Sequence, residues 1–126
     1  MAGRPERVRA GLNASGHAVC ATVDLVGGRV HLSIRHPDGA WEEERALQPD
    51  ELARLEGWAA GIHPALAHAI QDDPWGGPYD TFVHVEGSDR TVRLRQEGAS
   101  IRAPPAGDVL DWAMKVLGEA EDRLRA

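Results

Sequence analysis

Apolar and polar residues alternate over two stretches early in the chain, at residues 19–25 and 30–35. A period of two puts every second side chain on one face, so both stretches predict strands with one buried face. Gly27-Gly28 lies between them and suits the positive φ of a tight hairpin turn. Pro37-Asp38-Gly39 predicts a second turn. The charged segment at residues 41–47 is expected at a sheet edge, where charges discourage pairing with other chains.

Helical spacing replaces the alternation from Pro49 onward. A proline followed by two acidic residues is typical of the first turn of a helix, because carboxylates there face the positive end of the helix dipole. Apolar residues at positions 52, 55, 59 and 62 then predict one buried stripe. His63-Pro64 is expected to end this helix, since the residue before proline is pushed out of the α region. A further short turn is expected up to Ile70.

Two more strands and a second helix complete the pattern. Residues 82–86 and 91–96 are predicted strands joined by a short turn, and residues 104–124 a helix whose acidic residues, including Glu121, face solvent. The sequence therefore predicts an α+β fold: an antiparallel four- or five-stranded sheet with two main helices, in the order β-β-β-α-β-β-α. The expected core comprises Leu25, Val30, Leu32, Ile34, Leu52, Leu55, Ile62, Val92, Leu94, Leu110 and Leu117.

The chain of 126 residues has an ordinary length for one hydrophobic core. Residues 18–126 are predicted to form a single α+β domain. Residues 1–17 contain Gly, Pro, Arg and Ser without a recognisable period, which predicts a flexible N-terminal arm. The fold is accordingly expected to begin near Ala18.

Charge and composition narrow the classes of function. The chain has 14 Lys plus Arg against 20 Asp plus Glu, a formal net charge of −6, which argues against a nucleic-acid partner. Apolar runs fall short of the roughly 20 residues of a membrane span, and a signal-peptide pattern is missing. A cytoplasmic protein without a membrane partner is the expectation. Cys20 is the only cysteine and is expected to be an unreactive, half-buried strand residue.

Candidate catalytic chemistry is sparse. No cysteine pair, His-Glu-x-x-His segment or nucleophile elbow occurs, and His63 and His68 are five residues apart rather than four. The sequence therefore predicts no enzyme, no metal site and no cofactor. A catalytic alternative would need His31, His36 and His84 to converge with a carboxylate. The six candidate bases or ligands are His17, His31, His36, His63, His68 and His84.

The segment between residues 71 and 79 contains Asp-Asp-Pro-Trp-Gly-Gly-Pro, which no regular element accommodates. One interpretation is a crossover connection whose Trp75 folds back over the core. The other is a contact loop, because loops carry much recognition and tryptophan is enriched at interface hot spots.

Several features in order resemble the emfourin family. They are the hairpin-rich opening, Trp41-Glu-Glu-Glu-Arg-Ala-Leu-Gln-Pro-Asp-Glu-Leu, a Pro/Gly loop, Asp80-Thr-Phe-Val-His-Val-Glu-Gly-Ser-Asp-Arg-Thr-Val, and Ala103-Pro-Pro ahead of a Leu/Trp helix. The resemblance spans roughly Val23 to Leu117. Emfourins are small bacterial proteins that inhibit protealysin, a thermolysin-like zinc metallopeptidase.

The resemblance implies stoichiometric inhibition of such a peptidase by blocking its active-site cleft. It assigns no inhibitory residue. The candidates for partner contact are Asp72, Asp73 and Trp75, because a carboxylate can reach a catalytic zinc and a tryptophan can anchor an interface. The alternative is a non-inhibitory protein-binding module, such as an immunity or adaptor protein, whose acidic charge would speed association with a basic partner.

Overall fold

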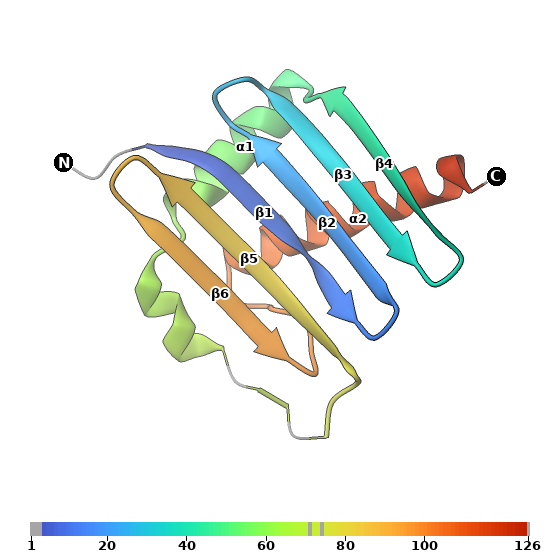
Figure 1. Cartoon of the computed structure of the whole chain (residues 1–126). Helices are drawn as coiled ribbons and strands as arrows, with labels where there is room; N and C mark the ends of the chain where they lie inside the picture. Colours follow the sequence, from blue (N-terminus) through green and yellow to red (C-terminus); the bar gives the residue numbers. More distant parts are fainter. Residues whose placement is uncertain (1–3, 71, 74, 126) are drawn as a thin grey trace.

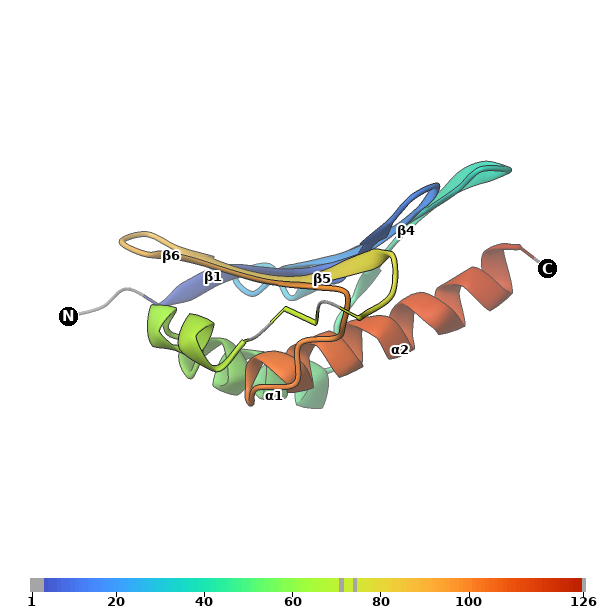
Figure 2. The same cartoon turned by 90° about the horizontal axis from the view of Figure 1, so that it is seen from below.

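The computed structural model describes residues 4–70, 72–73 and 75–125, and these form one six-stranded antiparallel sheet with both α-helices on the same face (Figures 1 and 2). The strand order across the sheet is β4-β3-β2-β1-β5-β6. The α+β class with an antiparallel sheet is as predicted. In chain order the elements are β1 (Pro5–Ala14), β2 (His17–Asp24), β3 (Arg29–His36), β4 (Gly39–Ala46), α1 (Pro49–Ala60), the 3₁₀ helix η1 (Pro64–Ala69), β5 (Tyr79–Gly87), β6 (Thr91–Glu97) and α2 (Ala106–Leu124).

Strand β1 corrects the predicted N-terminal arm. Residues 5–14 of the segment 1–17 form a central strand, so the sheet has six strands rather than four or five and one strand more before the first helix. Val8 pairs with Val23 on one side and with Val85 on the other. An apolar period of two does exist here, but it covers only Val8, Ala10 and Leu12, with an arginine and a glycine between them. The fold thus begins near Pro5, not near Ala18.

The next hairpins follow the prediction. Strands β2 and β3 pair antiparallel, with Val23 opposite Val30, and Gly28 in their turn has a φ of +68°. Strand β4 pairs only with β3 among the described residues and forms one edge of the sheet, as its charged sequence indicated. In β5, Val83 and Val85 are buried and face the core, although the alternation of residues 82–86 does not by itself identify the inner face of this strand.

The two helices bury the apolar stripes that their spacing predicted. In α1, Leu55 and Ala59 are buried, and Ile62 is buried just beyond the helix end. Leu52 is the one predicted core residue that is only partly buried, although it packs against the core. Helix α2 lies across the sheet and contacts each of β1 to β5 as well as α1 (Figure 2).

The opposite face of the sheet has no helix over it in the described part of the chain (Figure 2). Strand register places six arginines and six carboxylates on this open face, so it carries no net formal charge. The other charged strand residues, Glu6, Glu43 and Arg45, add one net negative charge, so helices and loops carry five of the six net negative charges. The open-face charges are Arg7, Arg9, Arg29, Arg35, Arg93 and Arg95, with Asp24, Glu42, Glu44, Asp80, Glu86 and Glu97.

Helices able to cross a membrane are missing from the described residues, because none is both long and apolar enough.

Candidate functional site

The loop that leads from η1 to β5 is fastened to the end of strand β6. The Asp73 N–H donates to the Glu97 carbonyl (3.2 Å), and the Gly77 N–H donates to the Gly98 carbonyl (3.0 Å). The Glu97 N–H in turn donates to Asp72 Oδ1 (2.9 Å). Backbone groups on both sides of the loop tip are thus hydrogen-bonded, although the loop has no regular structure. We call the described residues 72–73 and 75–78 the Trp75 loop.

Glycine is required where this loop touches β6. A Cβ added to Gly76 would lie 2.1 Å from the Gly98 carbonyl oxygen, far inside any contact that a real side chain makes. Gly98 itself has a φ of +76°, a conformation that other residues adopt only with strain. The glycines that made the segment look irregular therefore permit close backbone packing against β6.

Trp75 projects from the tip of the Trp75 loop. The residue is 92% exposed, so it does not fold back over the core as the crossover interpretation supposed. Its own N–H donates to Asp73 Oδ1 (2.9 Å), and the next N–H, from Gly76, donates to the Asp73 carbonyl (3.0 Å). Val26, 80% exposed in the β2–β3 turn, is the other large hydrophobic residue exposed to this degree among the described residues.

Asp72 and Asp73 both accept hydrogen bonds that hold the Trp75 loop in place. Each uses one carboxylate oxygen to accept a backbone N–H, from Glu97 and from Trp75 respectively. The structure therefore gives both residues a role in holding Trp75 outward. Contact of Asp72, Asp73 and Trp75 with a partner remains a prediction.

The catalytic alternative based on three histidines does not assemble. His31 and His84 lie on the open face of the sheet with strands β2 and β1 between them, whereas His36 lies on the helix-covered face. His31 Nε2 is 3.5 Å from Glu42 Oε1. His84 packs against Phe82, and its pKa is lowered by burial and by the charges of Arg9 and Arg93.

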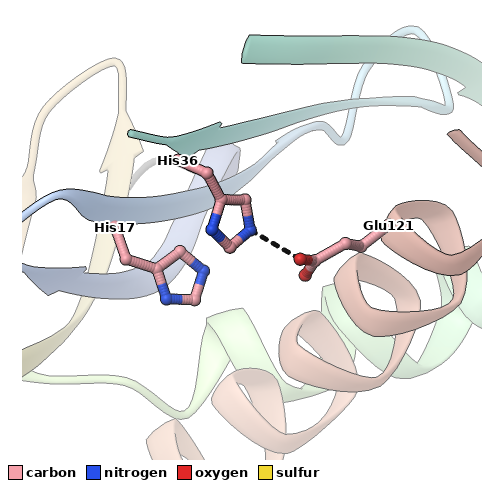
Figure 3. Close-up of side chains that lie close together, drawn as sticks. All are labelled: His17, His36 and Glu121. Carbon is pink, nitrogen blue, oxygen red and sulfur yellow. Dashed lines mark hydrogen bonds and ion pairs between the residues drawn. The ribbon is translucent and has the colours of Figure 1, made fainter. Parts of the chain in front are cut away.

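A different histidine pair does come together, with a carboxylate from α2 (Figure 3). The rings of His17 and His36 are stacked, with centroids 4.2 Å apart and planes 19° from parallel. His36 Nε2 lies 2.5 Å from Glu121 Oε1. His17 Nε2 is buried and has no hydrogen-bond partner among the described residues. We call these three residues the histidine–glutamate cluster.

Arg125 completes the surroundings of Glu121. Its Nη1 donates to Glu121 Oε1 (3.1 Å), and its Nη2 donates to Asp38 Oδ2 (2.9 Å). Burial raises the pKa of the Glu121 carboxyl, but hydrogen bonds from Arg125 and His36 and the nearby histidines outweigh it, so the pKa is lowered overall. The side chain of Glu121 is 26% exposed, so the expected solvent-facing position of this residue is corrected to a half-buried one.

The sequence held a signal for this cluster that the spacing of histidines along the chain did not reveal. In the β2–β3 hairpin, Ala18 pairs with Arg35, so His17 and His36 come next to each other one step further from the turn. Both have the same parity as the buried residues of their strands and therefore lie on the covered face. Paired residues of this hairpin have numbers that sum to 53, so the turn is centred between Val26 and Gly27. Testing which histidines are equidistant from that centre would have found the pair. Glu121 could not be found in this way, because its approach depends on how α2 crosses the sheet.

No protein-family model and no curated protein matches this sequence. The resemblance to emfourins therefore stays a prediction from the residues themselves.

Proposed function

We propose that this protein acts by binding another protein through the Trp75 loop, and that the partner is a thermolysin-like zinc metallopeptidase whose active-site cleft it blocks stoichiometrically. The observation that carries the proposal is the 92% exposure of Trp75 on a loop fastened to β6. Exposing a tryptophan to water is unfavourable, and tryptophan is prominent among residues that dominate binding energy.

For binding affinity, the attachment of the Trp75 loop to β6 matters as much as the exposure of Trp75. Binding costs free energy when mobile loops must become ordered, and a loop already hydrogen-bonded to a strand avoids much of that cost. Gly76 and Gly98 allow the close approach on which this fastening depends. A rigid projection of this kind suits an inhibitor, which needs a complementary surface of about 800 Å² per partner.

The choice of a metallopeptidase comes from the resemblance to emfourins, and the acidic loop is compatible with it. Asp72 and Asp73 each keep a second carboxylate oxygen beyond the hydrogen bonds described above. Carboxylate oxygens are ligands that zinc accepts. No catalytic role for this protein is part of the proposal.

One observation also favours the alternative of an immunity or adaptor protein. The open face has no net formal charge, so the negative charge is concentrated on the helices and loops. Such an uneven distribution would steer association with a basic protein of any kind.

The test is a titration of a thermolysin-like peptidase with the purified protein. We expect inhibition that saturates at one molecule per peptidase. Trp75→Ala should weaken inhibition by about 30-fold or more, which corresponds to the roughly 2 kcal/mol of a hot-spot residue. Val26→Ala is the matched control, because it removes the other highly exposed hydrophobic side chain from a turn at the opposite end of the sheet (Figure 1).

The possible results distinguish the location of the binding surface from the identity of the partner. Inhibition that is unchanged in Trp75→Ala would place the inhibitory surface outside the Trp75 loop. Absence of inhibition by a protein shown by circular dichroism to be folded would exclude the tested peptidase as a partner. Affinity capture that then returns a basic toxin or enzyme, and loses it in Trp75→Ala, would favour the immunity or adaptor role.

A further inference from the structure

We propose that His17, His36 and Glu121 form a binding site for a divalent transition-metal ion of the zinc type. The expectation from sequence was that this chain has no metal site, and the inference does not depend on the proposed function. Three donor side chains from β2, β3 and α2 point toward one another (Figure 3), and each offers a ligand atom within 4.8 Å of the other two.

The donor set suits this class of metal. Imidazole nitrogen and carboxylate oxygen are ordinary zinc ligands, and imidazole is also preferred by copper and nickel. Calcium and magnesium prefer sites made of oxygen ligands, which two histidines do not provide. Three protein ligands also leave a fourth position of a tetrahedral ion open to water.

The distances require only local adjustment. Ligand atoms about 2.0–2.1 Å from a tetrahedral zinc ion lie roughly 3.3 Å from one another. His36 Nε2 and Glu121 Oε1, now 2.5 Å apart and hydrogen-bonded, would separate slightly to admit the ion. The third donor would close in from within 4.8 Å.

His17 is the residue that must turn. Because its ring is stacked on His36 with planes 19° from parallel, one ion cannot lie in the plane of both rings. Rotation of the His17 ring breaks no hydrogen bond at Nε2, since that nitrogen has no partner in the described part of the chain. A buried ring nitrogen without a partner is unfavourable, and coordination would remove this cost.

Arg125 is the group that opposes metal binding. Its guanidinium donates to Glu121 and would repel a cation at that carboxylate. Its other hydrogen bond, to Asp38, and its position 5.2 Å from the centre of the Trp41 ring allow it to stay in place after releasing Glu121. Removing this guanidinium should therefore strengthen metal binding.

The experiment uses the full chain without an affinity tag and Zn²⁺ alone as the ligand. Calorimetric titration should show one Zn²⁺ per chain, and saturating Zn²⁺ should raise the midpoint of thermal unfolding. His17→Ala and His36→Ala should each weaken binding by more than about tenfold, the least that losing even a supporting hydrogen bond costs at many metal sites. Arg125→Ala should bind Zn²⁺ more tightly.

The controls distinguish a specific Zn²⁺ site from nonspecific Zn²⁺ binding by exposed histidines. His31→Ala removes an exposed histidine that also lies near a glutamate, so its Zn²⁺ affinity should equal that of the wild type. If His17→Ala fails to fold, ring resonances of the wild-type histidines supply the test: those of His17 and His36 should shift on Zn²⁺ addition, and those of His31 should not. Absence of binding, or equal loss in His31→Ala and His17→Ala, would overturn the proposal.

Discussion

The two faces of the sheet are made from alternate residues of the same strands, yet only one of them is packed. On the covered face, Leu32 is 1% exposed and lies in the core beneath the helices. On the open face, its neighbours His31 and Ser33 lie among arginines and carboxylates. Burial of apolar area stabilises the fold, whereas exposed ion pairs contribute little. Stability therefore depends mainly on one face, while the other can vary at small cost.

The candidate binding features lie at the margins of this arrangement. The Trp75 loop is fastened to the end of an edge strand, and the histidine–glutamate cluster lies at the first residue of β2, the last residue of β3 and the last turns of α2. Neither feature needs residues from the centre of the covered face. Substitutions at these margins should consequently affect binding without unfolding the protein.

Deleting residues 1–14 should have the largest effect on stability, because it removes the strand that joins the two halves of the sheet, β4-β3-β2 and β5-β6. Strand β1 pairs with β2 on one side and β5 on the other, and it buries Val8 and Ala10. We expect the truncated protein to lose its cooperative unfolding transition in urea, followed by circular dichroism. A transition close to that of the wild type would show instead that this segment is a dispensable arm. Arg9→Ala, on the open face of the same strand, should retain the transition.

Leu32→Ala should have the next largest effect on stability. Together with a variant of its neighbour in β3, it tests whether the covered face stabilises the fold more than the open face. Loss of a fully buried leucine side chain leaves a cavity and should lower the free energy of unfolding by about 2–5 kcal/mol. His31→Ala, one residue away on the open face, should lower it by less than about 1 kcal/mol, since its contact with Glu42 is exposed. Equal losses in the two variants, measured by urea denaturation, would contradict the division into a packed and an unpacked face.

Glu51→Gln should have a smaller effect that depends on pH. Hydrogen bonds from Arg45 lower the pKa of Glu51 most, burial opposes them, and the Gln48 N–H and Trp112 Nε1–H add to the lowering, so the pKa is about 2 rather than 4.5. The ionised carboxylate therefore stabilises the fold above about pH 4.5, and this contribution is lost as the pH falls toward about 2. At neutral pH the substitution should lower the free energy of unfolding by about 1–3 kcal/mol.

The pH series provides the check on Glu51→Gln. The difference in unfolding free energy between wild type and variant should shrink steadily as the pH is lowered through this range. A difference that stays constant would mean that the ionised form of Glu51 contributes nothing beyond what the amide supplies.

Much of the fold could be predicted because local patterns agree with the tertiary structure. The alternation in residues 19–35 specified both strands and the turn of the β2–β3 hairpin, and Pro49 marked the first residue of α1. Strand β1 was missed because its apolar alternation is short and includes an alanine, so its burial depends on neighbours on both sides rather than on its own composition.

The candidate sites were less predictable because they depend on contacts distant in sequence. Trp75 could be proposed from residue type, but its outward position follows from hydrogen bonds to Glu97 and Gly98, more than twenty residues away. His17 and His36 could have been paired from the hairpin register. Glu121 could not, because only the crossing of α2 over the sheet brings it to them.

The central position of β1 has a consequence for how the chain is made. Val8 must pair with Val85, and a contact between residues so far apart in sequence forms late and at a high entropic cost. During synthesis, β1 to β4 can pair with one another while the β5 side of β1 remains an open edge with apolar side chains. Such an edge invites strand exchange between nascent chains until residues 79–87 have been made. The middle of the finished sheet is thus the part that is vulnerable for longest during translation.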